Sequence, residues 1–251
     1  MNIKDRKLDE VMKWLEWTLC YALLRLSEIN PPGLDNFWLN QGTSLLLSFL
    51  QNAEDEVQER AATALATFVV IDDENGSIDP RRAEAVTRVG GIRLLLNLAR
   101  SWQEGPQAEA VKALANLSEH AYVAKAIVIS EAGAVKALVN LIFKWFGTAG
   151  GEGLLERAAG ALANLAADDK CSVEVASAGG VPALVTLARS CKVAPALANL
   201  AAHGDSNSNN AAVGQEAGAL EVLVQLTRSS HDGVRQEAAG ALLVALRHCC
   251  S

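Results

Sequence analysis

The chain has 251 residues, of which half are hydrophobic but only 5% are aromatic, and its formal net charge is −7. A core poor in aromatic rings has to be built from alanine, leucine and valine, which suits closely packed helices better than a β-sandwich. The acidic balance argues against nucleic-acid binding, which needs a basic face. No segment reaches about 18 uncharged apolar residues, so we expect no membrane span.

The N-terminal segment is predicted to form a helix that ends at the "NPPG" of residues 30–33. Its apolar side chains follow one helical stripe, made of Leu8, Val11, Leu15, Leu19, Ala22 and Leu26. We expect residues 1–32 to form a capping helix whose stripe covers the end of the structure that follows. A membrane-surface helix is the alternative, but its polar face mixes acidic and basic residues, which anionic lipid would not favour.

Two phrases alternate along the rest of the chain, which indicates internal repeats. The first is "AAGALANL" at 158–165, with relatives at 61–68, 110–117, 195–200 and 238–246. The second precedes a leucine-rich segment, as in "VGGIRLLLNLARS" at 89–101 and "AGGVPALVTLARS" at 178–190, with further copies at 132–143 and 217–229.

The spacing of the first phrase identifies the type of repeat. Equivalent positions fall at Thr67, Asn116, Asn164, Asn199 and Val244, with intervals in the forties apart from a shorter one between Asn164 and Asn199. This period fits HEAT and armadillo repeats and exceeds those of tetratricopeptide (about 34) and ankyrin (about 33) repeats. The glycine pair at 179–180 permits a steep corner between a short and a longer helix, which favours armadillo over HEAT.

We therefore predict an all-α fold, a right-handed armadillo-repeat superhelix or α-solenoid. The repeats are expected to occupy residues 33–251 as one continuous array of about five units. The unit around 181–202 is expected to be shortened, because "RSCKVAPALANL" joins one helix almost directly to the next. The last unit is expected to be incomplete, since the chain stops within the long helix of a repeat.

Several longer strings resemble the armadillo region of the plant ARABIDILLO family, which combines an F-box with armadillo repeats and is related to β-catenin by fold. The resemblance extends from about residue 8 to residue 243, and the strings are "GLDNFWLNQG", "VQERAATALATFVVIDDEN", "GGIRLLLNLARSW", "LERAAGALANLAADDKCSVEVA", "AAHGDSNSNNAAVGQEAGALE" and "GVRQEAAGAL". It implies a protein-interaction scaffold that recruits substrates for a ubiquitin ligase, promotes lateral root development and resides in the nucleus, the cytoplasm or both.

The sequence also departs from this family, because no F-box section precedes the repeats. We expect a shortened relative whose connection to a ubiquitin ligase is open. The alternative is a truncated paralogue with little activity, or one that competes with its full-length relative.

The resemblance also implies that the third helix of each repeat lines a concave groove that binds extended or helical segments of a partner. A side-chain amide offers one acceptor and two donors, so it can bond both N–H and C=O groups of a peptide backbone. Lysine and arginine beside the amides could pair with acidic groups of the partner. The predicted groove residues are Asn116, Asn164, Asn199, Thr67, Lys112 and Arg157. The alternative is that the asparagines bond a neighbouring repeat and that the mixed charges form a solvated face.

Enzymatic chemistry is not predicted. The histidines lie in different units without a carboxylate or cysteine at catalytic spacing, and "GTAGGEG" at 147–153 lacks the Lys-Ser/Thr of a phosphate loop. We expect no cofactor and no metal, although "RHCCS" at the C-terminus groups His248 with two cysteines. The expected partner is a protein, and the chain is expected to be a monomer, with self-association through an uncapped C-terminal end as the alternative.

Overall fold

The computed structural model describes residues 3–71, 77–130, 133–166, 169–188 and 218–228, with a few single residues between 216 and 242. In this described part the regular secondary structure is helical, and turns and loops join the helices. The one strand-like feature of these residues is an isolated bridge between Val70 and Ile78. None of the described helices is both long and apolar enough to span a membrane. The chain divides into two compact units, Met1–Leu117 and Ser118–Ser251.

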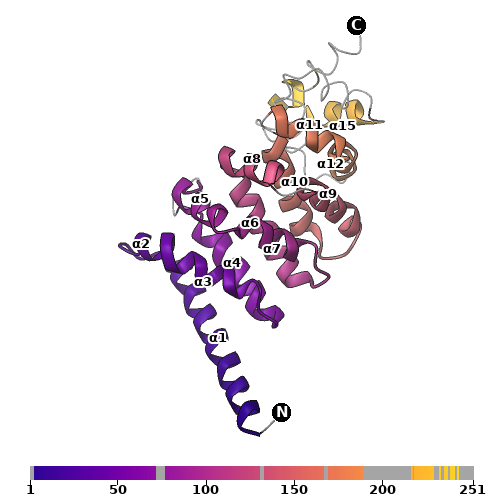
Figure 1. Cartoon of the computed structure of the whole chain (residues 1–251). Coiled ribbons are helices and arrows are strands. Elements are labelled where there is room, and N and C mark those ends of the chain that lie inside the picture. The colour runs from indigo at the N-terminus through magenta and orange to yellow at the C-terminus, as the bar shows by residue number, and fades with distance from the viewer. Residues whose placement is uncertain are drawn as a thin grey trace. The chain divides into compact units, whose positions relative to one another are not determined.

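The first unit contains the long N-terminal helix and the helices of the first repeats (Figure 1). In chain order these are α1 (Ile3–Ile29), α2 (Asp35–Phe37), the π-helical turn η1 (Trp38–Gly42), α3 (Thr43–Phe49), α4 (Asp55–Phe68), α5 (Pro80–Arg88), α6 (Gly91–Ala99) and α7 (Glu104–Ser118). The indole of Trp38 is fully buried and packs on Phe68, with the ring centroids 5.0 Å apart. This pair joins η1 to the end of α4.

Helix α1 ends at Ile29, as the sequence predicted, but a different face of it is buried. Leu8 and Leu15 of the predicted stripe are 63% and 47% exposed, so the expectation that this stripe would be covered is wrong. The face against α3 and α4 instead contains Cys20, Leu23 and Ser27, all nearly inaccessible. Helix α1 has 27 residues and α4 only 14, so the N-terminal end of α1 extends beyond α4 (Figure 1). Beside α4 it is the stripe of Cys20, Leu23 and Ser27 that faces inward, while Leu19 is 44% exposed.

The second unit contains the described helices α8 (Ala121–Ser130), α9 (Ala134–Trp145), α10 (Glu152–Ala166), α11 (Asp169–Ser177), α12 (Gly180–Ala188) and α15 (Ala219–Leu226). Helix α10 lies at the centre of its neighbours and packs against α8, α9, α11 and α12. Its alanine and leucine side chains are buried almost throughout, because small side chains let helices approach closely.

The corner expected at the glycine pair 179–180 is present in the second unit, and the pair at 90–91 has the same backbone conformation in the first unit. Gly90 and Gly179 have φ values of 82° and 90°, in the left-handed region that other residues avoid. The glycine after each of them begins the next helix, at Gly91 and Gly180. A Cβ at Gly180 would lie 2.7 Å from the carbonyl oxygen of Val175, so the second glycine allows the helices to meet closely.

The capping segment at 1–32 and the repeat array at 33–251 remain predictions as domain boundaries. The predicted shortening around 181–202 falls largely on residues outside the described ranges. The same holds for most of the last predicted unit and for the C-terminal "RHCCS".

Candidate functional site: the exposed stripe of the third helices

The helices α4, α7 and α10 correspond to the repeated "AAGALANL" phrase, and each is nearly enclosed by its neighbours. On α4 after Arg60, the side chains with partial exposure are Thr63 and Thr67. On α10 after Arg157, the positions with partial exposure are Gly160 and Asn164. Residues three to four apart lie on one helical face. Each of these helices therefore shows solvent one narrow stripe.

Helix α7 follows the same pattern. After Glu109 its partly exposed residues are Lys112, Ala115 and Asn116. We call these positions the third-helix stripe. It has a part in the first unit, with Arg60, Thr63 and Thr67 on α4 and Glu109, Lys112, Ala115 and Asn116 on α7, and a separate part in the second unit, with Arg157, Gly160 and Asn164 on α10. All the predicted groove residues that the structure describes belong to it, and Asn199 lies outside the described ranges.

Asn116 bonds back to the preceding third helix within the first unit. Its Nδ2 donates to the carbonyl oxygen of Ala66 at 2.9 Å, which places the amide beside Thr67. The Thr67 hydroxyl donates to the carbonyl oxygen of Thr63 on its own helix at 2.9 Å. The Oδ1 atom of Asn116 accepts no hydrogen bond among the described residues, so the amide keeps an acceptor for a partner.

Asn164 makes an equivalent link within the second unit. Its Nδ2 donates to the hydroxyl oxygen of Ser118 at 3.1 Å, and Ser118 is almost fully buried. Both described asparagines thus make the bonds to a neighbouring repeat that the sequence left open as a structural alternative. A stabilising bond and a binding role are compatible, since an amide has more than one polar group.

The charged residues of the stripe are partly paired. Lys112 Nζ lies 3.6 Å from Glu109 Oε2, with the lysine side chain 32% exposed. Burial raises the pKa of Glu59, and the neighbouring carboxylates of Glu109 and Glu56 raise it further. Arg157 is half-buried on α10. In the first unit the stripe therefore carries Arg60 and Lys112 together with the Glu109 carboxylate, so an incoming group meets charges of both signs.

Gly160 leaves an opening in the stripe of α10. A Cβ atom built at this position would meet no atom within 4 Å. The positions one turn before Asn164 and Asn116 are Gly160 and Lys112, and neither residue is aromatic. Among the described residues, the surface at Gly160, one turn before Asn164, is therefore open.

The sequence did not indicate which groups accept hydrogen bonds from Asn116 and Asn164. Ser118 follows the repeated phrase at a position where the other described copies have Val69 and Ala166. No pattern in the sequence distinguishes a serine that accepts a bond in the next repeat from a surface serine. The sequence also cannot identify the carbonyl oxygen of Ala66 as the acceptor for Asn116, because every residue has a carbonyl group.

Comparison with known proteins identifies the repeats. An armadillo/β-catenin-like repeat model matches residues 206–243. Protein ARABIDILLO 2 of Arabidopsis thaliana is 58% identical over 286 aligned residues, which cover 95% of this chain and 31% of that protein. Protein ARABIDILLO 1 is 57% identical, with 95% and 30% covered. The chain thus spans about a third of the length of these relatives.

Solved structures agree with this result. An engineered protein superposes with a TM-score of 0.77 at 30% identity, with 92% of this chain and 90% of the other covered. A designed armadillo repeat protein in complex with the peptide (KR)4 gives a TM-score of 0.75 at 24% identity, with 91% and 92% covered. The predicted all-α armadillo fold and the predicted resemblance are confirmed. The chain has the armadillo-repeat fold, and 95% of its length is similar in sequence to the ARABIDILLO proteins.

Proposed function

We propose that, in each of the two units, the residues of the third-helix stripe bind an extended or helical segment of a protein partner. The observation that supports this most directly is the enclosure of α4, α7 and α10. Their other faces are packed away, and what remains accessible after the first turns is the stripe with its threonines, asparagines, lysine and glycine. A surface with amides and few bulky side chains suits a peptide backbone that approaches closely.

Within this proposal the residues have separate roles. Asn116 accepts a backbone N–H of the partner through Oδ1 while its Nδ2 stays bonded to α4. Thr67 offers its hydroxyl oxygen beside it. Lys112 and Arg157 contact carbonyl or acidic groups of the partner, and Gly160 provides the space in which the bound segment passes α10.

We also propose, from the similarity to the ARABIDILLO proteins, that the partner is a substrate recruited for a ubiquitin ligase in the nucleus. On this view binding by the chain contributes to lateral root development. This wider role rests on similarity to proteins about three times as long, whereas the binding role rests on the described surface.

Substitution at Gly160 tests the binding role without removing a contact. Gly160→Gln adds a long neutral side chain in open space within the helix, so the fold should be kept and the stripe obstructed. Ala121→Gln is the matched control, because Ala121 is exposed on α8 and lies off the stripe. Wild type and both variants are used as bait in plant nuclear extract, and retained proteins are quantified by mass spectrometry.

We expect Ala121→Gln to retain the same proteins as wild type and Gly160→Gln to lose at least one of them. Circular dichroism should show equal helix content in all three. If Gly160→Gln retains every protein at wild-type level, the stripe is not the binding surface. If wild type retains nothing beyond the blank resin, the alternative of a chain with little activity of its own is favoured.

A further inference from the structure

One face of α1 is apolar and exposed, although the sequence predicted that it would be covered. Leu8, Leu15 and Leu19 of the predicted stripe are 63%, 47% and 44% exposed, and Ala22 is exposed as well. Met12, which lies on the same face, is 49% exposed. Exposed apolar residues that occur singly are ordinary, whereas a continuous row of them marks an interaction surface.

The spacing of this row is that of a helix that packs against another helix. Its residues, which we call the α1 seam, are Leu8, Met12, Leu15, Leu19, Ala22 and Leu26. The steps between them alternate strictly between four and three residues, which is the pattern that keeps one face of a helix against a partner helix. Since the seam runs along most of α1, a partner helix of similar length fits it.

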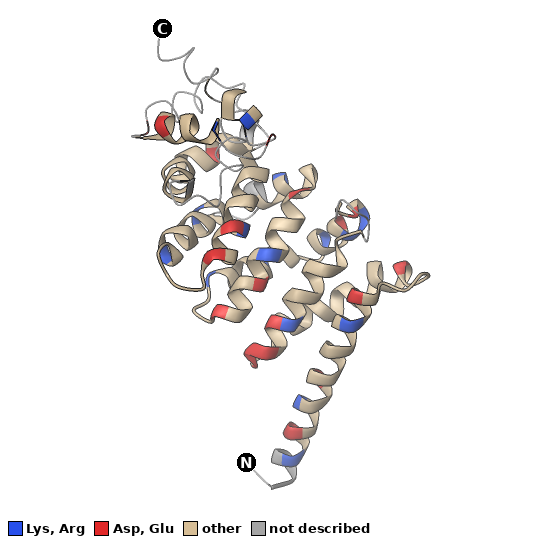
Figure 2. Cartoon of the chain, turned by 180° about the vertical axis from the view of Figure 1, so that it is seen from behind, with Lys and Arg blue, Asp and Glu red and all other residues tan. Residues whose placement is uncertain are grey.

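The middle of α1 carries no charge that would keep a second apolar helix away. No charged residue lies between Glu16 and Arg25 in the sequence, and Figure 2 shows an uncharged segment in the middle of this helix. The Glu16 carboxylate is directed towards Asn52, whose Nδ2 donates to it at 2.8 Å. The seam is therefore apolar along its centre, and the nearest carboxylate is already bonded within the chain.

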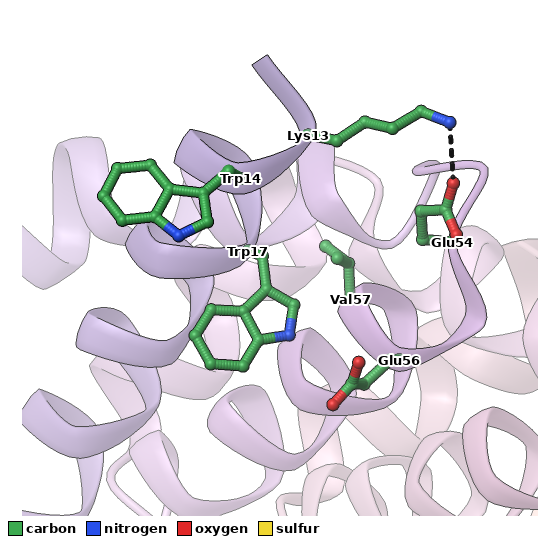
Figure 3. A pocket seen from close by; sticks show the side chains of 6 residues that line it. All are labelled: Lys13, Trp14, Trp17, Glu54, Glu56 and Val57. Atoms are coloured by element: carbon green, nitrogen blue, oxygen red, sulfur yellow. Dashed lines mark ion pairs between the residues drawn. The ribbon is translucent and has the colours of Figure 1, made fainter. Parts of the chain in front are cut away.

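Another side of α1 already has partners within the first unit. Lys13 extends from α1 to Glu54, with its Nζ 3.1 Å from the carboxylate (Figure 3). The Trp17 ring lies against the Arg60 guanidinium of α4, which is 4.2 Å from the ring centroid. The seam faces away from these contacts, and the N-terminal end of α1 extends beyond α4 (Figure 1). This arrangement leaves room for another helix beside the seam.

A second copy of α1 matches the seam when it runs in the opposite direction. Placing Leu15 opposite Leu19 of the second copy brings the first seam residue opposite the last and Met12 opposite Ala22. Every seam residue then faces another seam residue, and the long side chain of Met12 faces the smallest one. A parallel pair sets Ala22 against Ala22 of the second copy, which leaves a gap between the helices. The seam is therefore complementary to itself in the antiparallel direction.

We propose that two copies of the chain associate through the α1 seam as an antiparallel pair of helices. The exposed side chains of the seam and of Val11 beside it offer roughly 500 Å² on each copy, so the pair reaches about 1,000 Å², the lower limit of specific interfaces. The association is therefore weak and reversible, with a dissociation constant in the micromolar range. The seam shares no residue with the third-helix stripe, so this association is independent of the binding proposed above.

Sedimentation velocity of the full chain at rising concentration measures this association. Wild type should change from monomer to dimer across the micromolar range. Leu15→Glu and Leu19→Lys should each raise the dissociation constant at least about tenfold, because each places a charge in an apolar contact. Val173→Glu is the matched control, because Val173 is 47% exposed on α11 and lies outside the seam. The control should associate like wild type, and circular dichroism should show equal helix content in all four proteins.

Mixtures of variants test the antiparallel register. When Leu15→Glu is mixed with Leu19→Lys, the introduced carboxylate of one copy faces the introduced ammonium group of the other. This mixture should associate at least about tenfold more tightly than either variant alone. A mixture of Leu15→Glu with Met12→Lys brings no such pair together in this register and should associate no better than its components.

Four results would overturn the proposal. The first is a wild type that stays monomeric at high micromolar concentration, and the second is a dimer that Leu15→Glu and Leu19→Lys leave intact, which would place the contact on another surface. The third is equal association in the two mixtures, which would contradict the antiparallel register. The fourth comes from vesicles of phosphatidylcholine and phosphatidylserine: a monomeric wild type that binds them, and loses this binding through Leu15→Glu, would assign the seam to a membrane surface.

Discussion

Arg82 connects three separate segments of the first unit. Its guanidinium donates to the carbonyl oxygen of Phe68 at 2.9 Å, to Asn30 Oδ1 at 3.0 Å and to Asp35 Oδ1 at 2.8 Å. The residue is only 8% exposed, and the guanidinium also lies over the Phe68 ring. The hydrogen bond from Arg82 is the main cause that lowers the pKa of Asp35. The ends of α1 and α4 are thereby held to α5.

Arg82→Met is expected to lower the free energy of unfolding by about 2–3 kcal/mol, because it leaves the Phe68 carbonyl and its neighbours without a buried donor. Arg81→Met is the control, since the Arg81 side chain is 65% exposed and its ion pairs are long. That variant should stay within about 0.5 kcal/mol of wild type in urea unfolding followed by circular dichroism. Equal effects of the two substitutions would show that the Arg82 contacts are not stabilising.

Cys20 is a second residue whose environment has a measurable consequence. Its side chain is fully buried under α4, and Sγ donates to the carbonyl oxygen of Val57 at 3.5 Å. Burial raises the pKa of this thiol from 9.0 to about 11, and the nearby Arg60 charge opposes this only in part. The folded chain therefore favours the neutral thiol more strongly than the unfolded chain does.

The stability from the neutral Cys20 thiol should be complete below pH 9 and should be lost as the pH rises towards 11. Cys20→Ala should cost about 1–2 kcal/mol at pH 8 through lost packing. That cost should shrink between pH 9 and pH 11, because the alanine variant has no group here to ionise. Urea unfolding of both proteins at matched pH measures the difference, and a constant difference would contradict the raised pKa.

At the scale of single helices, two glycines in the second unit have opposite roles. Gly160 lies inside α10, where an added Cβ would meet nothing within 4 Å. Gly180 begins α12, where an added Cβ would lie 2.5 Å from Val175 Cγ1 and 2.7 Å from its carbonyl oxygen. A residue without a Cβ atom is therefore not needed for packing at Gly160 in α10, but it is required at Gly180, where α12 begins.

Gly160→Ala should raise the free energy of unfolding by about 0.5–1 kcal/mol, because alanine is the better helix former and no clash opposes it. Gly180→Ala should lower it by at least about 1 kcal/mol, because the backbone of α11 has to move away. Thermal and urea unfolding of the two variants beside wild type provide the comparison. A Gly180→Ala variant as stable as wild type would mean that the corner adjusts freely.

At the scale of the whole molecule, the sequence predicted features that recur and missed those that occur once. Glycine corners recur at Gly90 and Gly179, and an asparagine recurs at Asn116 and Asn164, so comparison along the chain identified these positions. The buried face of α1 was predicted wrongly because apolar residues follow more than one stripe of that helix. The contacts of α1 with α3 and α4 decide between the stripes.

The single contacts between distant segments are the other part that sequence could not supply. Arg82 and Asp35 are far apart in the chain, and neither belongs to a repeated phrase. The ion pair between Lys13 and Glu54 likewise depends on where α1 crosses the start of α4. Pairings of this kind follow from the packed structure and leave no periodic signal.

Site-directed photocrosslinking tests the central claim, that partners bind along the third-helix stripe, most directly. Benzoylphenylalanine replaces Gly160 in one protein and Ala121 in another, and both are irradiated with the proteins retained from plant nuclear extract. We predict covalent partner adducts from position 160 and none from position 121. Adducts from position 121 alone, or none from position 160 while a partner remains bound, would contradict the account.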